Sequence, residues 1–493
     1  MINLASTPNL IEVIYQHADA QPDATALICG NTTLSAGELR NIVDRCAAEL
    51  LRQGLTDGDR LGIQLQDTWE FVAVLLAAIR ISVTVVPLDW RASPREIERL
   101  SDYFKLTGIA RVPGSPDIRA LQDPIILYVD GVWLHNLPGS GMPLPPVNNV
   151  TPFLISLSSG TTGDPKGMYC SFENHYARLQ RNLKVFEATP GLRYLSCLPL
   201  CFSAGIFYCL DSLCLGNVVI LYPTLFAPQE IIQAVKQHRA TLLVVVPTVV
   251  RWLLELPESR QPLLHDLMYL INTGGPLTPD EKKLTVTQIN ANFYDIFGTS
   301  ASGLLCVAGP DDMATAPKSL GRAMPFLEHE IVDSDGGTVP IDTPGLLRCR
   351  GAGISDSAWE GDKDAPRSEG LDAGWYYTGD VASIDADGRY YLHGRADNVI
   401  NRGGVNIYPN VIEAVLRKHQ KVREVVVFGK PDPQLGEYVA AMIVVNDHVN
   451  DADLIAYCRD KLAPHLVPKE FIFKNSLPKT SAGKIKLPTG KLS

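Results

Sequence analysis

The chain has 493 residues, of which 46% are hydrophobic and 20% charged, as expected of a globular protein with roughly two to four domains. Its net charge of -10 and the lack of any lysine and arginine block disfavour binding to nucleic acid or to a membrane surface. The N-terminus lacks the pattern of a signal peptide, and no run of about 18 apolar residues predicts a membrane span.

Ten cysteines are scattered along the chain, several of them inside apolar runs, such as Cys197, Cys209 and Cys306. No Cys-x-x-Cys pair and no Cys/His cluster has the spacing of a zinc site. We therefore expect buried free thiols in a cytoplasmic protein.

The first third of the chain alternates helical patterns with short runs rich in β-branched residues. Apolar residues recur at helical spacing over 38–54 and 70–81, and strands are expected at 59–65 and 83–89. The same alternation returns later as a strand at 217–223, a helix at 228–240 and a strand at 241–247. Such alternation predicts βαβ units, in which helices cover parallel sheets.

The pattern changes near residue 340. Turns rich in Gly and Asp and short strands fill 340–391, which predicts a β-rich subdomain. A small α+β module follows Arg395, with helices expected at 409–419 and 451–462 and strands at 422–429 and 438–445. We therefore predict an α/β fold with two domains. Residues 1–394 form βαβ-type sheets plus the β-rich subdomain, and residues 395–493 form a small α+β C-terminal domain.

The segment SLSSGTTGDPKG, residues 156–167, follows an apolar run and combines glycines, hydroxyls and one lysine. Glycines let backbone N–H groups turn toward an anion, hydroxyls add donors, and a lysine neutralises phosphate charge. The segment therefore indicates a phosphate-binding loop. It is not a Walker A loop, because Pro165, Lys166 and Gly167 stand where Gly, Lys and Ser/Thr are required. A flexible surface linker is the alternative.

The segment SSGTTGDPKG resembles the nucleotide-binding signature of the adenylate-forming enzymes, which include acyl- and aryl-CoA ligases, peptide-synthetase adenylation domains and luciferases. Five further segments resemble motifs of that superfamily in the same order along nearly the whole chain. They are ISVTVVPLDWR at 81–91, NTGGPLT at 272–278, YYTGD at 376–380, GRADNVINRGGVNIYPNVIE at 394–413 and LPKTSAGKIK at 477–486.

The resemblance implies an AMP-forming acid–thiol ligase. Such an enzyme joins a carboxylate to ATP, giving an acyl-adenylate and pyrophosphate, and then transfers the acyl group to a thiol. Residues 1–394 would be the AMP-binding domain, and residues 395–493 the mobile domain with the catalytic lysine. Because both reactants of the first step are anions, a cationic and donor-rich site lowers its barrier.

The resemblance also assigns nucleotide-binding residues. Thr161, Thr162, Gly163 and Lys166 would hold the β- and γ-phosphates of ATP. The adenine slot would be lined by Gly274, Gly275, Pro276, Phe297 and Gly298. Asp380 would bind the ribose hydroxyls with help from Arg395, although an ordinary turn aspartate is the alternative.

The C-terminal motifs carry the catalytic and moving parts. Lys484 would bridge the carboxylate and the α-phosphate, a role that suits a long flexible cation; a solvated tail lysine is the alternative. Asp397 occupies the hinge position about which the small domain turns between the two half-reactions. Gly403 and Gly404 would let a pantetheine arm pass close to the backbone.

The segment FGTSASG, residues 297–303, departs from the superfamily pattern Tyr-Gly-x-Thr-Glu. Ser300 replaces the threonine and keeps a hydroxyl, so we expect it to be catalytic. Ala301 replaces the glutamate that contacts Mg²⁺, so no protein ligand for a metal is assigned. Magnesium bound by ATP phosphates and water remains compatible with this pattern, since Mg²⁺ often needs only one or two carboxylates.

A second departure concerns the acid-binding pocket. Phe202 stands where many CoA ligases place a histidine, and no acidic residue lies between Arg193 and Asp211 to pair an ammonium group. The expected pocket residues are neutral, which favours an apolar or aromatic monocarboxylate over an amino acid. They are Phe202, Ser203, Ala204, Gly205, Asn272, Thr273, Ser302 and Gly303.

The acceptor is expected to be CoA, and phosphopantetheine on a separate carrier protein is the alternative. The expected cofactors are thus ATP, Mg²⁺, and CoA or phosphopantetheine. Loss of the acid at Ala301 leaves a second class of function open, a catalytically impaired nucleotide- or acyl-binding homologue. No feature of the sequence favours a luciferase-like oxygenase.

Overall fold

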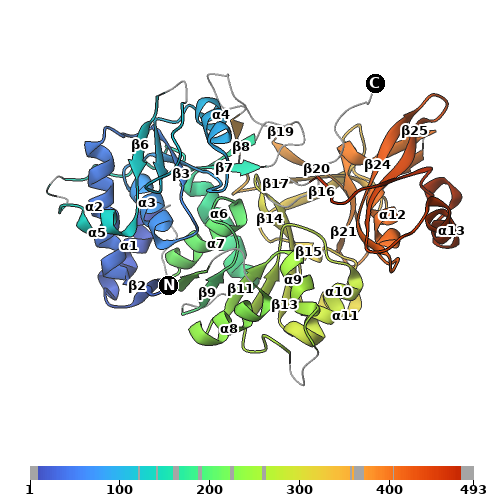
Figure 1. The fold of residues 1–493 in the computed structure, drawn as a ribbon, viewed down its shortest axis with the longest axis horizontal. Helices are drawn as coiled ribbons and strands as arrows, with labels where there is room; N and C mark the ends of the chain where they lie inside the picture. The colour runs from blue at the N-terminus through green and yellow to red at the C-terminus, as the bar shows by residue number, and fades with distance from the viewer. Residues whose placement is uncertain are drawn as a thin grey trace.

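The structure is a computed structural model. It describes residues 9–119, 123–139, 141, 143–158, 166–186, 191–222, 227–257, 262–355, 358–359, 371–372, 374–403 and 405–478. Figure 1 shows several sheets and helices in the N-terminal part and a separate sheet with two helices in the C-terminal part, drawn in orange and red. This arrangement confirms the predicted α/β fold with a small α+β C-terminal domain.

The larger sheet of the N-terminal part has nine strands in the order β15-β14-β13-β12-β11-β9-β10-β1-β2. The strands from β1 to β13 run parallel, and β2, β14 and β15 pair antiparallel at the two edges. Their bounds are β1 Thr25–Cys29, β2 Thr32–Ser35, β9 Arg193–Ser196, β10 Val218–Leu221, β11 Leu242–Val245, β12 Tyr269–Asn272, β13 Phe293–Thr299, β14 Gly303–Ala308 and β15 Arg322–Ala323. The expected strands at 217–223 and 241–247 are confirmed.

A second sheet has seven strands in the order β18-β8-β7-β4-β3-β5-β6. Its bounds are β3 Arg60–Gln64, β4 Thr84–Pro87, β5 Gly108–Arg111, β6 Ile125–Tyr128, β7 Leu154–Ser158, β8 Lys166–Cys170 and β18 Ala358–Trp359. Strands β7 and β8 form an antiparallel pair in which Ser158 lies opposite Lys166. This pair brackets the loop that the sequence predicts to bind phosphate.

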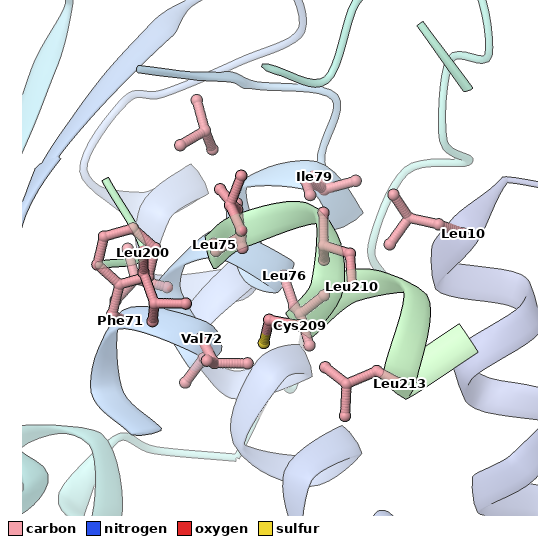
Figure 2. Close-up of a cluster of buried hydrophobic side chains, with 14 of the residues drawn as sticks. Leu10, Phe71, Val72, Leu75, Leu76, Ile79, Leu200, Cys209, Leu210 and Leu213 are labelled. Carbon is pink, nitrogen blue, oxygen red and sulfur yellow. The ribbon is translucent and has the colours of Figure 1, made fainter. Parts of the chain in front are cut away.

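Helices α3, Trp69–Arg80, and α7, Ser203–Cys214, pack together in the largest apolar cluster. In Figure 2, Leu76 of α3 lies near Leu210 and Leu213 of α7, and Leu10, the first residue of α1 (Leu10–Ala20), lies beside them. Since α3 is apolar nearly all round, it is buried on every side. The same cluster includes residues of both sheets, so these helices join the two layers.

The remaining helices of the N-terminal part mostly begin at recognisable caps. For example, Ser35 and Glu38 form a capping box at the start of α2. The bounds are α1 Leu10–Ala20, α2 Ala36–Arg52, α4 Pro94–Phe104, α5 Gly131–Asn136, α6 Phe172–Phe186, α8 Pro228–His238, α9 Pro247–Leu254, α10 Pro279–Leu284, a π-helical turn Thr285–Ile289 and α11 Pro310–Thr315. The helices expected at 38–54, 70–81 and 228–240 are therefore confirmed.

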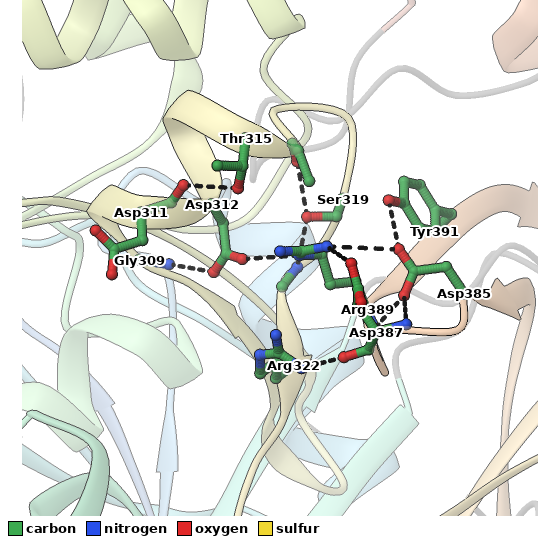
Figure 3. A network of polar contacts seen from close by, with 12 residues as sticks. Gly309, Asp311, Asp312, Thr315, Ser319, Arg322, Asp385, Asp387, Arg389 and Tyr391 are labelled. Atoms are coloured by element: carbon green, nitrogen blue, oxygen red, sulfur yellow. Dashed lines mark hydrogen bonds and ion pairs between the residues drawn. The ribbon is translucent and has the colours of Figure 1, made fainter.

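The β-rich subdomain is an antiparallel sheet in the order β16-β17-β20-β19, with β21 paired to β20. Its bounds are β16 Glu328–Val332, β17 Gly345–Arg350, β19 Leu371–Asp372, β20 Trp375–Ile384 and β21 Tyr390–Arg395. Figure 3 shows how Arg389 in the turn between β20 and β21 contacts Asp312 of α11, Asp385 and Asp387. The pairs with Asp385 and Asp387 lie within the turn, whereas the pair with Asp312 fastens the β20–β21 hairpin to α11, which follows β14 of the nine-stranded sheet.

The C-terminal part contains a sheet in the order β23-β22-β25-β24, with β26 paired to β25. Its bounds are β22 Ile400–Arg402, β23 Val405–Ile407, β24 Val422–Asp432, β25 Gly436–Val445 and β26 Glu470–Phe473, with helices α12 Pro409–Leu416 and α13 Asp451–Lys461 and 3-10 turns at Ala396–Asn398 and Pro464–Leu466. The two helices and two strands predicted after Arg395 are confirmed.

All ten cysteines are free thiols, and only Cys29 is partly exposed, which agrees with the expectation from the sequence. Among the described residues, no helix is both long and apolar enough to cross a membrane.

Candidate active site

Three segments that carry predicted site residues lie at the carboxyl ends of parallel strands. Asn272 ends β12, Ser300 follows β13, and Phe202 and Ser203 open α7 after β9. Ligands of open α/β sheets bind in the crevice outside the carboxyl ends of the strands. The topology therefore brings together three segments that the sequence placed at the adenine, catalytic and acid positions.

Two of the predicted residues contact each other directly. Ser203 donates a hydrogen bond to Ser300, with 3.0 Å between the two Oγ atoms. The Oγ of Ser156, in β7, lies 2.5 Å from Ser203 Oγ. Ser300 and Ser203 are half-buried, whereas Ser156 is buried. A hydroxyl chain thus connects the strand before the predicted phosphate loop to the acid pocket and to Ser300.

The turn after β13 is built from short polar contacts. Thr299 Oγ1 and Ser302 Oγ are hydrogen-bonded at 2.8 Å, and the Ser302 N–H donates to Thr299 Oγ1 at 3.1 Å. Gly298 must be glycine, since a Cβ there would lie 2.2 Å from the carbonyl oxygen of Gly303. Ala301 is buried against Met168 and Ala358. The turn therefore presents the Ser300 hydroxyl and holds a methyl group where the superfamily has a carboxylate.

Two buried arginines of α6 hold this turn from behind. Arg178 donates from Nη2 to the Ala301 carbonyl oxygen at 2.6 Å and to Ser355 Oγ at 3.0 Å, and from Nε to the Gly353 carbonyl oxygen at 2.7 Å. Arg181 donates from Nη2 to the Ser302 carbonyl oxygen at 2.9 Å. Burial lowers the pKa of both guanidinium groups, to about 10 for Arg181.

Sequence reasoning missed both arginines. The only signal was their place in α6, where positions 178 and 181 share the apolar face with His175, Tyr176 and Leu179. A cation on such a face must find partners from other segments. Those partners lie more than 100 residues away in the chain, in the 301–302 and 353–355 segments.

The adenine turn, residues 273–276, is supported by a buried polar cluster. Asn272 Nδ2 donates to Asp295 Oδ1 at 2.7 Å and to the Gly275 carbonyl oxygen at 3.3 Å. Lys282 Nζ lies 2.7 Å from Asp295 Oδ2 and donates to the Ser319 carbonyl oxygen at 3.0 Å. Asn272 is fully buried, so its side chain supports the turn from inside and faces Asp295.

The other predicted pocket and adenine residues differ in their exposure. Residues exposed to solvent or half-buried are Phe202, Ala204, Thr273, Gly274, Gly275, Pro276, Phe297, Gly298 and Gly303, whereas Gly205 and Ser302 are buried. The Gly274 backbone has a φ of +81°, in the left-handed region that glycine tolerates best. Their roles as lining residues stay predictions.

The residues of the predicted ribose site lie on both strands of the β20–β21 hairpin. Asp380 lies opposite Arg395 in register, and Arg395 Nη1 lies 3.7 Å from Asp380 Oδ1. The same guanidinium donates to the Thr378 carbonyl oxygen at 2.6 Å and lies 3.3 Å from Asp397 Oδ1. Asp380 is buried, whereas Arg395 and Asp397 are exposed. Arg395 thus links the predicted ribose aspartate to the predicted hinge.

Several predicted residues lie outside the described part of the chain: Thr161, Thr162, Gly163, Gly404 and Lys484. For Lys166 the backbone is described as the first residue of β8, and its side chain is not. Gly403 donates its backbone N–H to the Leu435 carbonyl oxygen at 2.7 Å and has a φ of +61°.

Two family models match the chain. The model described as AMP-binding enzyme matches residues 14–358, and the model described as AMP-binding enzyme C-terminal domain matches residues 411–484. Indoleacetate–CoA ligase of Aromatoleum aromaticum is 29% identical over 97% of this chain and 96% of its own length. Feruloyl-CoA synthase of Amycolatopsis sp is 30% identical over 95% of this chain and 96% of its own length.

Solved structures share the fold. The O-succinylbenzoate coenzyme A synthetase MenE of Bacillus subtilis, in complex with AMP, superimposes with a TM-score of 0.87 at 24% identity, covering 96% of both chains. ATP-bound MatB of Rhodopseudomonas palustris superimposes with a TM-score of 0.86 at 24% identity, covering 97% of both chains. Because the first family model alone matches well over half of the residues, the chain belongs to the AMP-binding enzyme family.

Proposed function

We propose that this protein is an AMP-forming acid–thiol ligase. It activates a carboxylic acid with ATP to an acyl-adenylate, releases pyrophosphate, and transfers the acyl group to CoA with release of AMP. The observation that carries the proposal is the meeting of three segments at Ser300. These are the strand before the phosphate loop, the start of α7 and the turn after β13.

The charge of each proposed site residue suits the part of the substrates that it would contact. Asp380 offers two carboxylate oxygens to the ribose hydroxyls, and Arg395 orients that carboxylate. The phosphate loop, with Thr161, Thr162, Gly163 and Lys166, neutralises the leaving pyrophosphate. Lys484 supplies a positive charge between the two anions that react. The roles of the loop residues and of Lys484 rest on the resemblance of their motifs.

The pocket favours an acid with an apolar or aromatic body. Phe202, Ala204, Thr273 and Gly303 carry no charge. Arg178, the guanidinium behind the Gly303 turn, is already bonded to protein acceptors, so it is not free to bind a second carboxylate. Two relatives act on indoleacetate and feruloyl groups by their names. We infer that an aryl or aryl-alkyl monocarboxylate is the substrate class.

Magnesium enters this proposal as part of the substrate MgATP. A structure of MenE contains ATP and a magnesium ion. In this protein Ala301 is buried among apolar side chains where a coordinating acid would stand. Among the described residues, no group of three or more His, Cys, Asp or Glu side chains is placed to hold a metal. We infer that phosphates and water supply most of the ligands of the ion.

The acceptor follows from the C-terminal motif and the relatives. Gly403, with Gly404, would line the passage of a pantetheine arm, and the matched relatives are CoA ligases by name. Transfer to a carrier protein uses the same first step and is the second candidate. The free, mostly buried thiols support a cytoplasmic location. We propose that residues 1–394 and 395–493 are the two domains, with Asp397 as the hinge between them.

A pyrophosphate-release assay tests the proposal. Indole-3-acetate, ferulate, benzoate and medium-chain fatty acids are each incubated with MgATP and the full chain, with and without CoA. The expected result is acid-dependent pyrophosphate release and a CoA thioester from at least one aryl acid. Release without a thioester favours the carrier-protein alternative. No release with any acid contradicts catalysis and favours an impaired nucleotide-binding homologue.

A further inference from the structure

Three serine hydroxyls form a chain through the centre of the candidate site. Ser156 contacts Ser203, and Ser203 donates to Ser300. A serine hydroxyl has a single proton to donate. Because Ser203 gives its proton to Ser300, the contact between Ser156 and Ser203 is donated by Ser156. The chain therefore runs in one direction, from Ser156 through Ser203 to Ser300.

The direction leaves the Ser300 proton free for a ligand. Within the described part of the chain, no residue accepts a hydrogen bond from Ser300, and its side chain is half-buried at the edge of the turn. A hydroxyl oxygen has two lone pairs, and because one accepts the proton of Ser203, the Ser300 proton must take one of the other positions around the oxygen. Chains of hydrogen bonds also polarise one another, which strengthens the last donor.

The covalent order of ATP indicates what this donor meets. Ser156 lies just before the predicted β,γ-phosphate loop, and Thr299, beside Ser300, contacts Tyr376 of the predicted ribose motif at 3.3 Å between the hydroxyl oxygens. The α-phosphate of ATP lies between its ribose and its β- and γ-phosphates. Ser203 opens the helix at the acid pocket. The acid and the α-phosphate must therefore meet near Ser300.

We propose that Ser203, backed by Ser156, is a positioning residue that aims the Ser300 hydroxyl proton at an oxygen of the α-phosphate. This inference rests on the proposed function. It gives Ser203 a role beyond lining the acid pocket, and it assigns a role to Ser156. A freely rotating hydroxyl loses rotational entropy on binding, whereas the bond from Ser203 already limits the orientations of the Ser300 proton.

The test compares AMP with adenosine, because the two ligands differ only in the α-phosphate. Affinities are measured by calorimetry on the full chain for wild type, Ser203→Ala, Ser300→Ala and the double variant. We expect each single substitution to weaken the affinity for AMP about 3- to 10-fold, the range of one hydrogen bond. The affinity for adenosine should stay unchanged. The double variant should bind AMP no more weakly than Ser300→Ala. Ser212→Ala, on the same helix α7, is the control and should match wild type.

Each outcome bears on the inference. Additive losses in the double variant would mean that Ser203 acts independently of Ser300, and would overturn it. Equal weakening of adenosine would mark a general structural defect and would also overturn it. A wild type that does not distinguish AMP from adenosine contradicts both the inference and the proposed function. The predicted AMP pattern without pyrophosphate release from any acid supports the positioning role and contradicts only the proposed catalysis.

Discussion

Replacement of Arg178 by methionine tests whether buried hydrogen bonds hold the turn that carries Ser300. Methionine keeps an unbranched apolar stem and removes the donors to the Gly353 carbonyl oxygen, the Ala301 carbonyl oxygen and Ser355 Oγ. The Ala301 carbonyl oxygen keeps the Ser355 backbone N–H at 2.7 Å, so two acceptors lose their partner. At about 1–3 kcal/mol for each unsatisfied buried group, the loss is about 2–6 kcal/mol.

Part of this loss in the free energy of unfolding is offset, because the substitution also removes a charge that has to be desolvated when the protein folds. We therefore expect a net destabilisation of about 2–4 kcal/mol. Arg178→Lys should be nearly as damaging, since an ammonium lacks the planar fork that reaches three acceptors.

Urea unfolding followed by intrinsic fluorescence measures the change in the free energy of unfolding. Arg52→Met is the control, because Arg52 is exposed at the end of α2, where it forms an ion pair with Glu49. That variant should change stability by less than about 1 kcal/mol. Equal stability of Arg178→Met and Arg52→Met would refute the reasoning that the buried contacts hold the turn. A stable Arg178→Met enzyme with an unchanged adenylation rate would refute the link to Ser300.

Four further variants test other parts of the account. Lys282→Met leaves the Asp295 carboxylate buried without its ion pair, so unfolding free energy should fall by about 3–5 kcal/mol in urea titrations. Burial and a neighbouring guanidinium lower the pKa of His329 from 6.5 to about 4. As pH falls, the His329 imidazole is therefore protonated in the unfolded chain before it is protonated in the folded chain. The contribution of neutral His329 to the free energy of unfolding is full above pH 6.5 and declines toward pH 4, and His329→Gln should flatten that decline. Ala301→Glu should lower the Mg²⁺ concentration needed for half-maximal pyrophosphate release, and equal Mg²⁺ curves would contradict our reading of this position. Lys484→Ala should nearly abolish adenylation and spare thioester formation from a supplied adenylate; equal loss of both steps would contradict two conformations.

The fold was largely predictable because its cause is local. Helical spacing at 38–54 and 70–81 and the β-branched runs between them gave elements within a few residues of their observed bounds. The order of the motifs then identified the family, since each motif is a short contiguous segment. Local patterns of this kind survive in the sequence because each turn or strand needs its own residue types.

The support of the site was not predictable, because its contacts join distant segments. Arg178 reaches acceptors at 301 and 353–355, and no spacing rule connects these positions. The sequence placed Ser156 at the start of the predicted phosphate-binding segment, yet it lies in strand β7, and its partner Ser203 lies 47 residues away. Asn272 was expected to line the acid pocket, yet its side chain faces Asp295 and the Gly275 carbonyl oxygen. Tertiary packing decided where each of these side chains points.

The most direct test of the central claim is acid-dependent release of pyrophosphate coupled to thioester formation by the full chain. Product analysis with an aryl acid, MgATP and CoA should give equal amounts of pyrophosphate, AMP and aryl-CoA. With CoA omitted, pyrophosphate should appear only to the extent of enzyme-bound adenylate. ADP and phosphate as products, or no turnover of any acid in the screen, would contradict the assignment of this protein as an AMP-forming acid–thiol ligase.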